Sequence, residues 1–224
     1  MAEEQAALPP QTTVVADPAP LGLAGFALTT FVLSVHNANW APDLIWVGLA
    51  LFYGGAAQFV AGVMEFRNKN TFGATAFCTY GAFWAAFATF VVLVLAGAVP
   101  STLNIDNAGG WFLASFAIFN TYMLLWSSRV NKAVFAVFFT LEVTEIILFI
   151  GNFLAGSGHV IGTDLIHVGG YTGVVTAAAA WYASAAGVIN SMSDHPVLPV
   201  GTPFWGGPVG RLTSRPGRLG QTAP

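Results

Sequence analysis

Six long apolar segments decide what this chain can fold into. A membrane-spanning α-helix needs roughly 20 mostly apolar residues. The segments of about this length are Leu21–Ala38, Leu44–Met64, Thr71–Gly97, Ala108–Ser127, Ala133–Phe153 and Asp164–Asn190. Strands of a membrane barrel are about ten residues long and polar at alternate positions, which these continuous runs are not. The sequence therefore predicts an all-α membrane protein, a bundle of six transmembrane helices.

The composition supports this class and divides the chain into three parts. Hydrophobic residues make up 55% of the 224 and charged residues 8%, which leaves too little polar surface for a soluble domain. We expect an N-terminal segment at 1–20 with an entrance motif and a six-helix domain at 21–191. A tail at 192–224, rich in Pro and Gly, is expected to be flexible and cytoplasmic.

The basic residues predict the orientation. They are Arg67, Lys69, Arg129, Lys132, Arg211, Arg215 and Arg218. With six spans, all seven fall on one side of the membrane, in two loops and the C-terminal tail. The positive-inside rule then puts both termini in the cytoplasm. The N-terminus has no basic region followed by a short apolar core, so it is not a signal peptide. We expect a multi-pass protein of the plasma membrane, the inner membrane in a bacterium.

Two carboxylates, Glu142 and Glu145, lie inside the fifth span. A charge near a bilayer centre costs roughly 2.5–3.5 kcal/mol on insertion scales, so such groups usually line a path or a site. Helical periodicity puts them on one face with Phe138, Leu141, Phe149 and Asn152, and turns Val137, Val143, Ile147 and Ile150 toward lipid. The two carboxyls are either protonated structural residues or a coupled pair that handles protons.

The first two spans also have mixed faces. The first aligns Phe26, Thr29, Thr30, Leu33 and Asn37, and the second aligns Gly54, Gly55, Gln58, Ala61, Gly62 and Glu65. Small residues permit close helix approach, and Gln58 is either an interhelical hydrogen-bond partner or a substrate ligand. For Glu65 we expect an interfacial ion pair with Arg67.

The start of the first span is a potential anion site. In Asp17-Pro18-Ala19-Pro20-Leu21-Gly22-Leu23, Pro20 can occupy the first helical position. The amides of Leu21, Gly22 and Leu23 would then form a positive helix end that attracts a carboxylate. Asp17 could equally cap its own helix.

Several contiguous motifs resemble one family. Asp17–Leu23 is similar to the N-P-A-P-L-G-L signature of the acetate uptake transporters, which include bacterial acetate and succinate transporters and fungal ammonia and acetate export proteins. Phe52–Gln58, Ala61–Phe66, Asn70–Gly73 and Thr79–Gly81 resemble the bacterial members almost position by position. The resemblance runs from about Asp17 to Asn190.

This resemblance implies six spans, homohexamers, and uptake of acetate and related short carboxylates, coupled to protons or conducted in a channel-like way. It also implies an apolar constriction, which by motif position falls on Phe26, Tyr80 and Leu141. The chain departs from the family at Asp17, where the signature has Asn, and at Glu142 and Glu145, where the enterobacterial proteins have uncharged residues.

The combined reading is a membrane transporter for acetate and related short-chain carboxylates, proton-coupled, with protons and the lipid bilayer as its other partners. The substrate-binding candidates are Leu21, Gly22, Leu23, Thr29, Thr30, Asn37 and Gln58, and Glu142 and Glu145 are the proton-coupling candidates. The alternatives are a passive anion or weak-acid channel and a cation channel that uses the Glu pair.

The sequence gives no reason to expect an enzyme. It has no nucleotide-binding loop, no cluster of metal ligands and no nucleophile beside a base. Cys78 is read as a packing residue, and His36, His159 and His167 as surface or packing residues at the outer face. We therefore expect no cofactor, no metal and no nucleic-acid partner.

Overall fold

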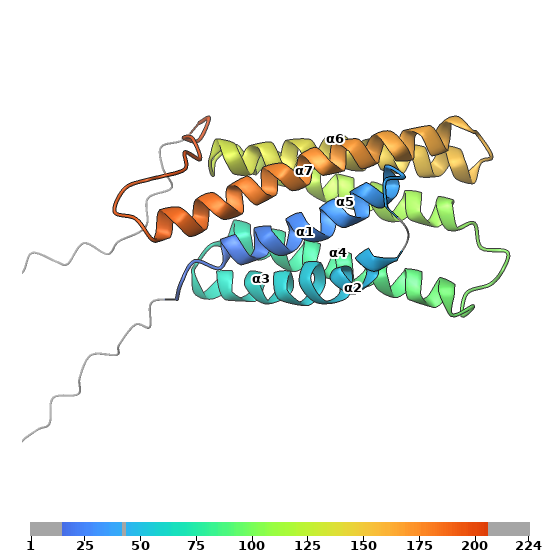
Figure 1. Cartoon of the computed structure of the whole chain (residues 1–224), viewed down its shortest axis with the longest axis horizontal. Helices are drawn as coiled ribbons and strands as arrows, with labels where there is room; N and C mark the ends of the chain where they lie inside the picture. Colours follow the sequence, from blue (N-terminus) through green and yellow to red (C-terminus); the bar gives the residue numbers. More distant parts are fainter. Residues whose placement is uncertain (1–14, 42–43, 206–224) are drawn as a thin grey trace, which may run out of the picture.

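The computed structural model describes residues 15–41 and 44–205, and their regular secondary structure is entirely helical (Figure 1). The elements are α1 (Ala19–Asn37), α2 (Ile45–Leu51), η1 (Phe52–Ala57), α3 (Gln58–Arg67), α4 (Thr71–Leu95), α5 (Ile105–Ser127), α6 (Lys132–Gly156) and α7 (Ile161–Ser191). Helices α2, η1 and α3 form one continuous span, so six helices are long and apolar enough to cross a membrane. The predicted all-α bundle of six spans is confirmed, with ends that shift by up to a few residues.

Asparagines begin three of the helices. Asn70, Asn104 and Asn131 precede α4, α5 and α6, and each accepts a hydrogen bond from the backbone N–H three residues later. Such N-caps satisfy amides that have no partner within the helix. Asn104 also donates from Nδ2 to the carbonyl of Gly156 at 2.7 Å, which ties the start of α5 to the end of α6.

The helices pack in a ring. Neighbours in this ring are either consecutive in the chain or, like α1 and α7, are brought together by small residues. Helix α6 lies between α5 and α7, α7 packs on α1, and α1 packs on the α2–η1–α3 span, which contacts α4. Figure 1 shows both described ends of the chain at one end of the bundle, which we call the terminal face. Helix α1 begins at this face and ends near the opposite one.

Large aromatic side chains bridge α4 and α5. Phe83 of α4 stacks on Phe112 of α5 with ring centroids 5.1 Å apart and meets Phe116 edge-on at 4.7 Å. Phe87 also stacks on Phe112, at 5.7 Å. Side chains of this size hold the two helices apart, so the α4–α5 boundary is wider than the glycine-lined boundary between α1 and α7.

Glycines bring α1 and α7 into close contact. A methyl group at Gly170 would collide with the backbone of Ser34 and Ala38. Near the other end of the pair, Ser184 donates to the carbonyl of Pro20 at 2.7 Å. Close approach at small residues is a main source of helix association in membranes, so α1 is held firmly along its length.

A π-helical turn interrupts the second span at Phe52–Ala57 and packs directly on α1. A Cβ atom added to Gly25 would lie 2.7 Å from the Tyr53 carbonyl oxygen, and one added to Gly54 would lie 2.6 Å from Thr29 Oγ1. Such π-turns are often found at functional sites. The face expected from the sequence (Gly54, Gly55, Gln58, Ala61, Gly62 and Glu65) is buried.

The segment that follows α7 is packed, which differs from the expected flexible tail. Asn190 Oδ1 accepts hydrogen bonds from the amides of Val197 and Leu198, and the carbonyl of Val200 accepts one from Ala133 at the start of α6. Trp205 Nε1 donates to Ser128 Oγ at 2.8 Å. Hydrogen bonds to Asn190, Ala133 and Ser128 thus anchor a stretch that its Pro and Gly content suggested would be loose. Residues 206–224, with three of the basic residues, lie outside the described part.

We predict that Gly25→Ala destabilises the bundle while Gly48→Ala does not. The added methyl at Gly25 meets a backbone carbonyl, which cannot rotate away, whereas a methyl at Gly48 of α2 meets nothing within 4 Å. Overpacking of this kind costs about 1–3 kcal/mol, or a fall of several °C in melting temperature. Thermal unfolding of the detergent-purified variants measures it. Equal melting temperatures for the two variants would contradict the tight α1–η1 contact.

Candidate functional site

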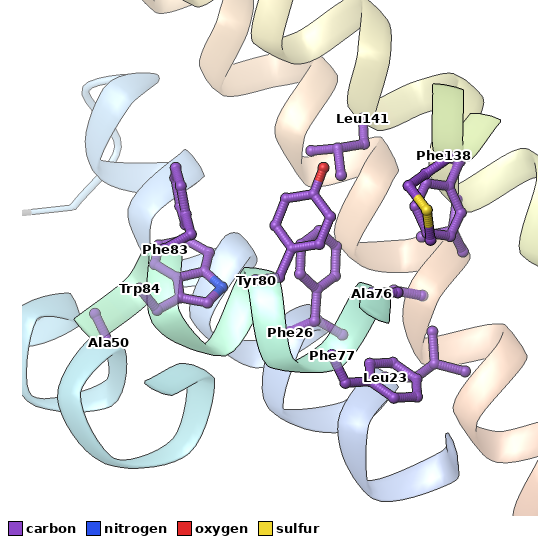
Figure 2. Packing of buried hydrophobic residues seen from close by; sticks show 14 of the residues in the cluster. Leu23, Phe26, Ala50, Ala76, Phe77, Tyr80, Phe83, Trp84, Phe138 and Leu141 are labelled. Atoms are coloured by element: carbon purple, nitrogen blue, oxygen red, sulfur yellow. The ribbon is translucent and has the colours of Figure 1, made fainter. Parts of the chain in front are cut away.

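Three side chains from three helices meet in the middle of the bundle. Phe26 of α1, Tyr80 of α4 and Leu141 of α6 are each more than nine-tenths buried. The rings of Phe26 and Tyr80 meet edge to face with centroids 5.6 Å apart, and Figure 2 shows Leu141 beside the Tyr80 hydroxyl end. The residues that the family resemblance assigned to a constriction are therefore brought together.

Two small cavities share these three residues as common walls. The cavity toward the face opposite the termini, which we call the far cavity, measures about 40 Å³. Its other lining residues are Thr30, Leu33, Ser34, Asn37, Phe83, Trp84, Thr144, Glu145 and Leu148. The near cavity, toward the terminal face, measures about 20 Å³ and is lined also by Leu23, Gln58, Ala76, Phe77, Val137 and Phe138. A path through the bundle would therefore be narrowest at Phe26, Tyr80 and Leu141.

Asn120 of α5 holds the Tyr80 hydroxyl in place. This side chain is fully buried, and its Oδ1 accepts a hydrogen bond from Tyr80 Oη at 2.9 Å. Its Nδ2 donates to the Phe138 carbonyl at 3.0 Å and to Glu142 Oε2 at 2.7 Å. The amide thus joins α4, α5 and α6. Sequence reasoning did not single out Asn120, although an Asn in the middle of an apolar span is a signal that could have identified it.

Glu142 is hydrogen-bonded on the outer side of the α5–α6 boundary. Its Oε1 lies 2.7 Å from Thr121 Oγ1, which is also 2.8 Å from the Ala117 carbonyl. A hydroxyl has one hydrogen. Thr121 can donate it to a Glu142 carboxylate, or turn it to Ala117 and accept a hydrogen bond from a Glu142 carboxylic acid. Both protonation states of Glu142 are therefore accommodated.

Glu145 is the carboxyl that reaches the far cavity. It is 3% exposed, its Oε1 lies 3.4 Å from Tyr80 Oη, and its Oε2 has no hydrogen-bond partner. The single hydroxyl hydrogen of Tyr80 serves the shorter bond to Asn120. Neither carboxyl oxygen of Glu145 therefore receives a strong hydrogen bond. Burial without a donor partner favours the neutral form of Glu145.

The two glutamates therefore do not share one environment. Of the residues expected on the polar face of α6, Phe138, Leu141 and Glu145 line the two cavities. Glu142 contacts the constriction only through Asn120. Val137 was expected to face lipid and is instead 3% exposed, as a wall of the near cavity. Of the other expected lipid-facing positions, Val143 and Ile150 are exposed.

The start of α1 has part of its backbone bonded within the protein. Asp17 Oδ1 accepts a hydrogen bond at 3.0 Å from the N–H of Ala19, the first residue of α1, and Gly22 N donates to the Pro18 carbonyl. The Leu21 side chain is 45% exposed, and Gly22 packs against Phe77. Of the three residues proposed for this helix end, only Leu23 lines a cavity.

The remaining polar candidates divide between the two cavities and the helix contacts. Thr30 and Asn37 line the far cavity, and Gln58 lines the near cavity with its Oε1 unpartnered. Thr29 is fully buried against Gly54, away from both.

Glu65 corrects one expectation. It is fully buried and accepts a hydrogen bond from Asn68 Nδ2 at 3.1 Å. The ion pair that we expected with Arg67 is not formed. The loop after α3 turns Asn68 back toward Glu65, whereas the Arg67 side chain is exposed.

A six-helix membrane bundle with a buried constriction between two cavities is the architecture of a membrane transport protein. The chain belongs to the GPR1/FUN34/yaaH family, whose model matches residues 2–202. It is a multi-pass integral membrane protein.

Three similar proteins place the chain within this family. The protein "Accumulation of dyads protein 2" of Saccharomyces cerevisiae is 39% identical over 187 residues, which are 80% of this chain and 64% of that protein. The "Succinate-acetate/proton symporter SatP" of Escherichia coli is 36% identical over 192 residues, 84% of this chain and 97% of that protein. The solved "Structure of the bacterial acetate channel SatP" matches with a TM-score of 0.76 at 35% identity, over 84% of this chain and 100% of the other. The chain thus spans somewhat less than two thirds of the yeast relative and nearly all of the bacterial one.

We predict that Tyr80 and Asn120 are energetically coupled. A double-mutant cycle with Tyr80→Phe and Asn120→Leu should give a coupling of about 0.6 kcal/mol, the average for hydrogen bonds between membrane helices, and at most about 1.7 kcal/mol. Unfolding of the four proteins in mixed micelles, by addition of a denaturing detergent, measures it. Strict additivity of the two substitutions would show that the bond does not link α4 to α5.

Proposed function

We propose that this protein transports acetate and related short-chain carboxylates across the membrane together with protons. The observation that carries the proposal is the pair of cavities that share Phe26, Tyr80 and Leu141. The names of the bacterial relatives, a succinate-acetate/proton symporter and an acetate channel, supply the substrate class. A transport role of this kind involves no catalysis.

The constriction favours the neutral acid over the anion. Desolvation of an unpaired carboxylate in an apolar environment is far more costly than that of a carboxylic acid. Among the described residues, Lys and Arg occur only at the ends of the spans or beyond them, as Arg67, Lys69, Arg129 and Lys132. No cation is therefore available at the constriction to neutralise an anion, and a proton has to take that role.

The same basic residues support an orientation. In the described part of the chain they lie at the terminal face, which we assign to the cytoplasm by the positive-inside rule. The far cavity then faces the outside, and uptake runs from it through the constriction to the near cavity. The proposal retains the plasma membrane, or bacterial inner membrane, and the homohexamer that the family resemblance implies.

We expect labelled acetate to accumulate in proteoliposomes when a pH gradient, acid outside, is imposed, and to do so above the leak of protein-free liposomes. In Phe26→Ala the missing ring opens the constriction, so acetate should equilibrate without accumulation. Phe139→Ala is the matched control, because Phe139 is 52% exposed on the same helix as Leu141. A membrane potential imposed without a pH gradient distinguishes proton coupling from movement of the anion alone.

The outcomes of this experiment separate the alternatives. Equilibration without accumulation in the wild-type protein would favour a passive channel for the carboxylate anion. Cation currents through a planar bilayer, with no acetate movement, would favour the cation channel. No movement of acetate or of cations would overturn the proposal.

We predict different effects for the two glutamates. Glu145→Gln removes the carboxyl that lines the far cavity, so accumulation driven by the pH gradient should be lost. Glu142→Gln keeps a group that can accept from Asn120, so accumulation should be weakened and not lost. Initial rates of acetate uptake at several external pH values measure the difference. An unchanged pH dependence in both variants would exclude a coupling role for the pair.

A further inference from the structure

We propose that the far cavity contains a carboxylate-binding subsite formed by Trp84, Thr30 and Glu145, in which Glu145 passes its proton to the bound substrate. The identity of the substrate rests on the proposed function. The subsite itself rests on three buried polar atoms that have no partner in the protein.

Each of these atoms lies in a side chain that lines the same cavity. Trp84 Nε1, Thr30 Oγ1 and Glu145 Oε2 are buried without a hydrogen-bond partner, and their side chains are 3%, 6% and 3% exposed. Buried polar groups in proteins are almost always hydrogen-bonded, so three exceptions around one cavity need an explanation. A ligand that enters the cavity supplies the missing partners.

The donor set fits a carboxylate. Trp84 Nε1 is a donor only, and Thr30 can donate its hydroxyl hydrogen. Glu145 in its neutral form offers a third hydrogen. Three donors match the lone pairs of a carboxylate, and a metal cation would find no ligand in the indole N–H. Figure 2 shows Trp84 and Phe83 beside Tyr80, which places the indole next to the constriction.

The proton step balances within this subsite. A substrate anion from the outside binds to Trp84 and Thr30, and the Glu145 O–H bond breaks as an O–H bond forms on the substrate. The neutral acid crosses the constriction, and the Glu145 carboxylate regains a proton from external water. One proton moves with each acid. The titratable groups beside Glu145 are Tyr80 of α4 and Glu142 of its own helix, whereas the polar side chains that α1 presents to the cavity are Thr30, Ser34 and Asn37.

Another tryptophan provides a matched control. Trp46 is 4% exposed and its Nε1 also has no partner, but its ring stacks on Phe87 at 5.2 Å and does not line the far cavity. Trp46→Phe therefore makes the same chemical change as Trp84→Phe at equal burial. Thr30→Val removes the second donor with little change in shape.

The test combines binding and transport in the full-length protein. Saturation-transfer NMR of acetate with the purified protein reports binding without transport, and initial uptake rates in proteoliposomes give KM. We expect Trp84→Phe and Thr30→Val each to weaken binding and to raise KM about tenfold, as expected for a lost hydrogen bond to a charged group. Trp46→Phe should leave both values unchanged.

The outcomes distinguish this inference from the proposed function. Wild-type uptake with KM and binding unaltered in Trp84→Phe and Thr30→Val would overturn the subsite and leave acetate transport intact. Acetate binding that is lost in Trp84→Phe, in a protein that moves no acetate, would support the subsite and reject the proposed function. Neither binding nor uptake in the wild-type protein would overturn both.

Discussion

Hydrogen bonds between side chains inside the hydrocarbon region determine how the helices of this bundle are oriented, because lipid offers no partner to a buried polar side chain. Several of the buried polar side chains bond from one helix to another. Asn120 bonds to α4 and α6, and Thr144 of α6 shares a 3.1 Å hydrogen bond with Thr176 of α7. These bonds fix the rotation of each helix about its own axis. Of the seven buried side-chain atoms without a partner in the described part of the chain, three belong to residues that line the far cavity.

Helix α1 is the element that sets the constriction, and small residues position it on both sides. Gly170 of α7 admits its backbone on one side, and Gly25 admits the Tyr53 carbonyl of the π-turn on the other. Phe26, next to Gly25, is then directed at Tyr80. A side chain at either glycine would push α1 away, so the width of the constriction depends on residues that never contact a solute.

The number of spans was predictable from the sequence, and the partners of individual side chains were not. Apolar runs suffice for six spans, and motif position singled out Phe26, Tyr80 and Leu141, which the bundle places side by side. Helical periodicity could not separate Glu142 from Glu145, because residues three apart lie on one face and only the neighbours α4 and α5 distinguish them. Val137 was assigned to the lipid face, although it lies four residues before Leu141 and therefore beside it on the helix. The packed segment as far as Trp205 was missed because composition does not reveal that Ala133 and Ser128 offer it hydrogen bonds.

The separation of the two carboxyls explains how a charge can be kept near an apolar constriction without blocking it. Glu142 lies at the outer boundary of the bundle, where Thr121 accommodates either protonation state. Through Asn120 it fixes the amide with Oδ1 toward Tyr80, so the Tyr80 hydrogen points at Asn120 and leaves Glu145 without a strong donor. Burial without a donor favours the neutral form of Glu145 at the cavity wall. A neutral donor beside the constriction attracts a carboxylate, whereas a second negative charge in its place would repel it.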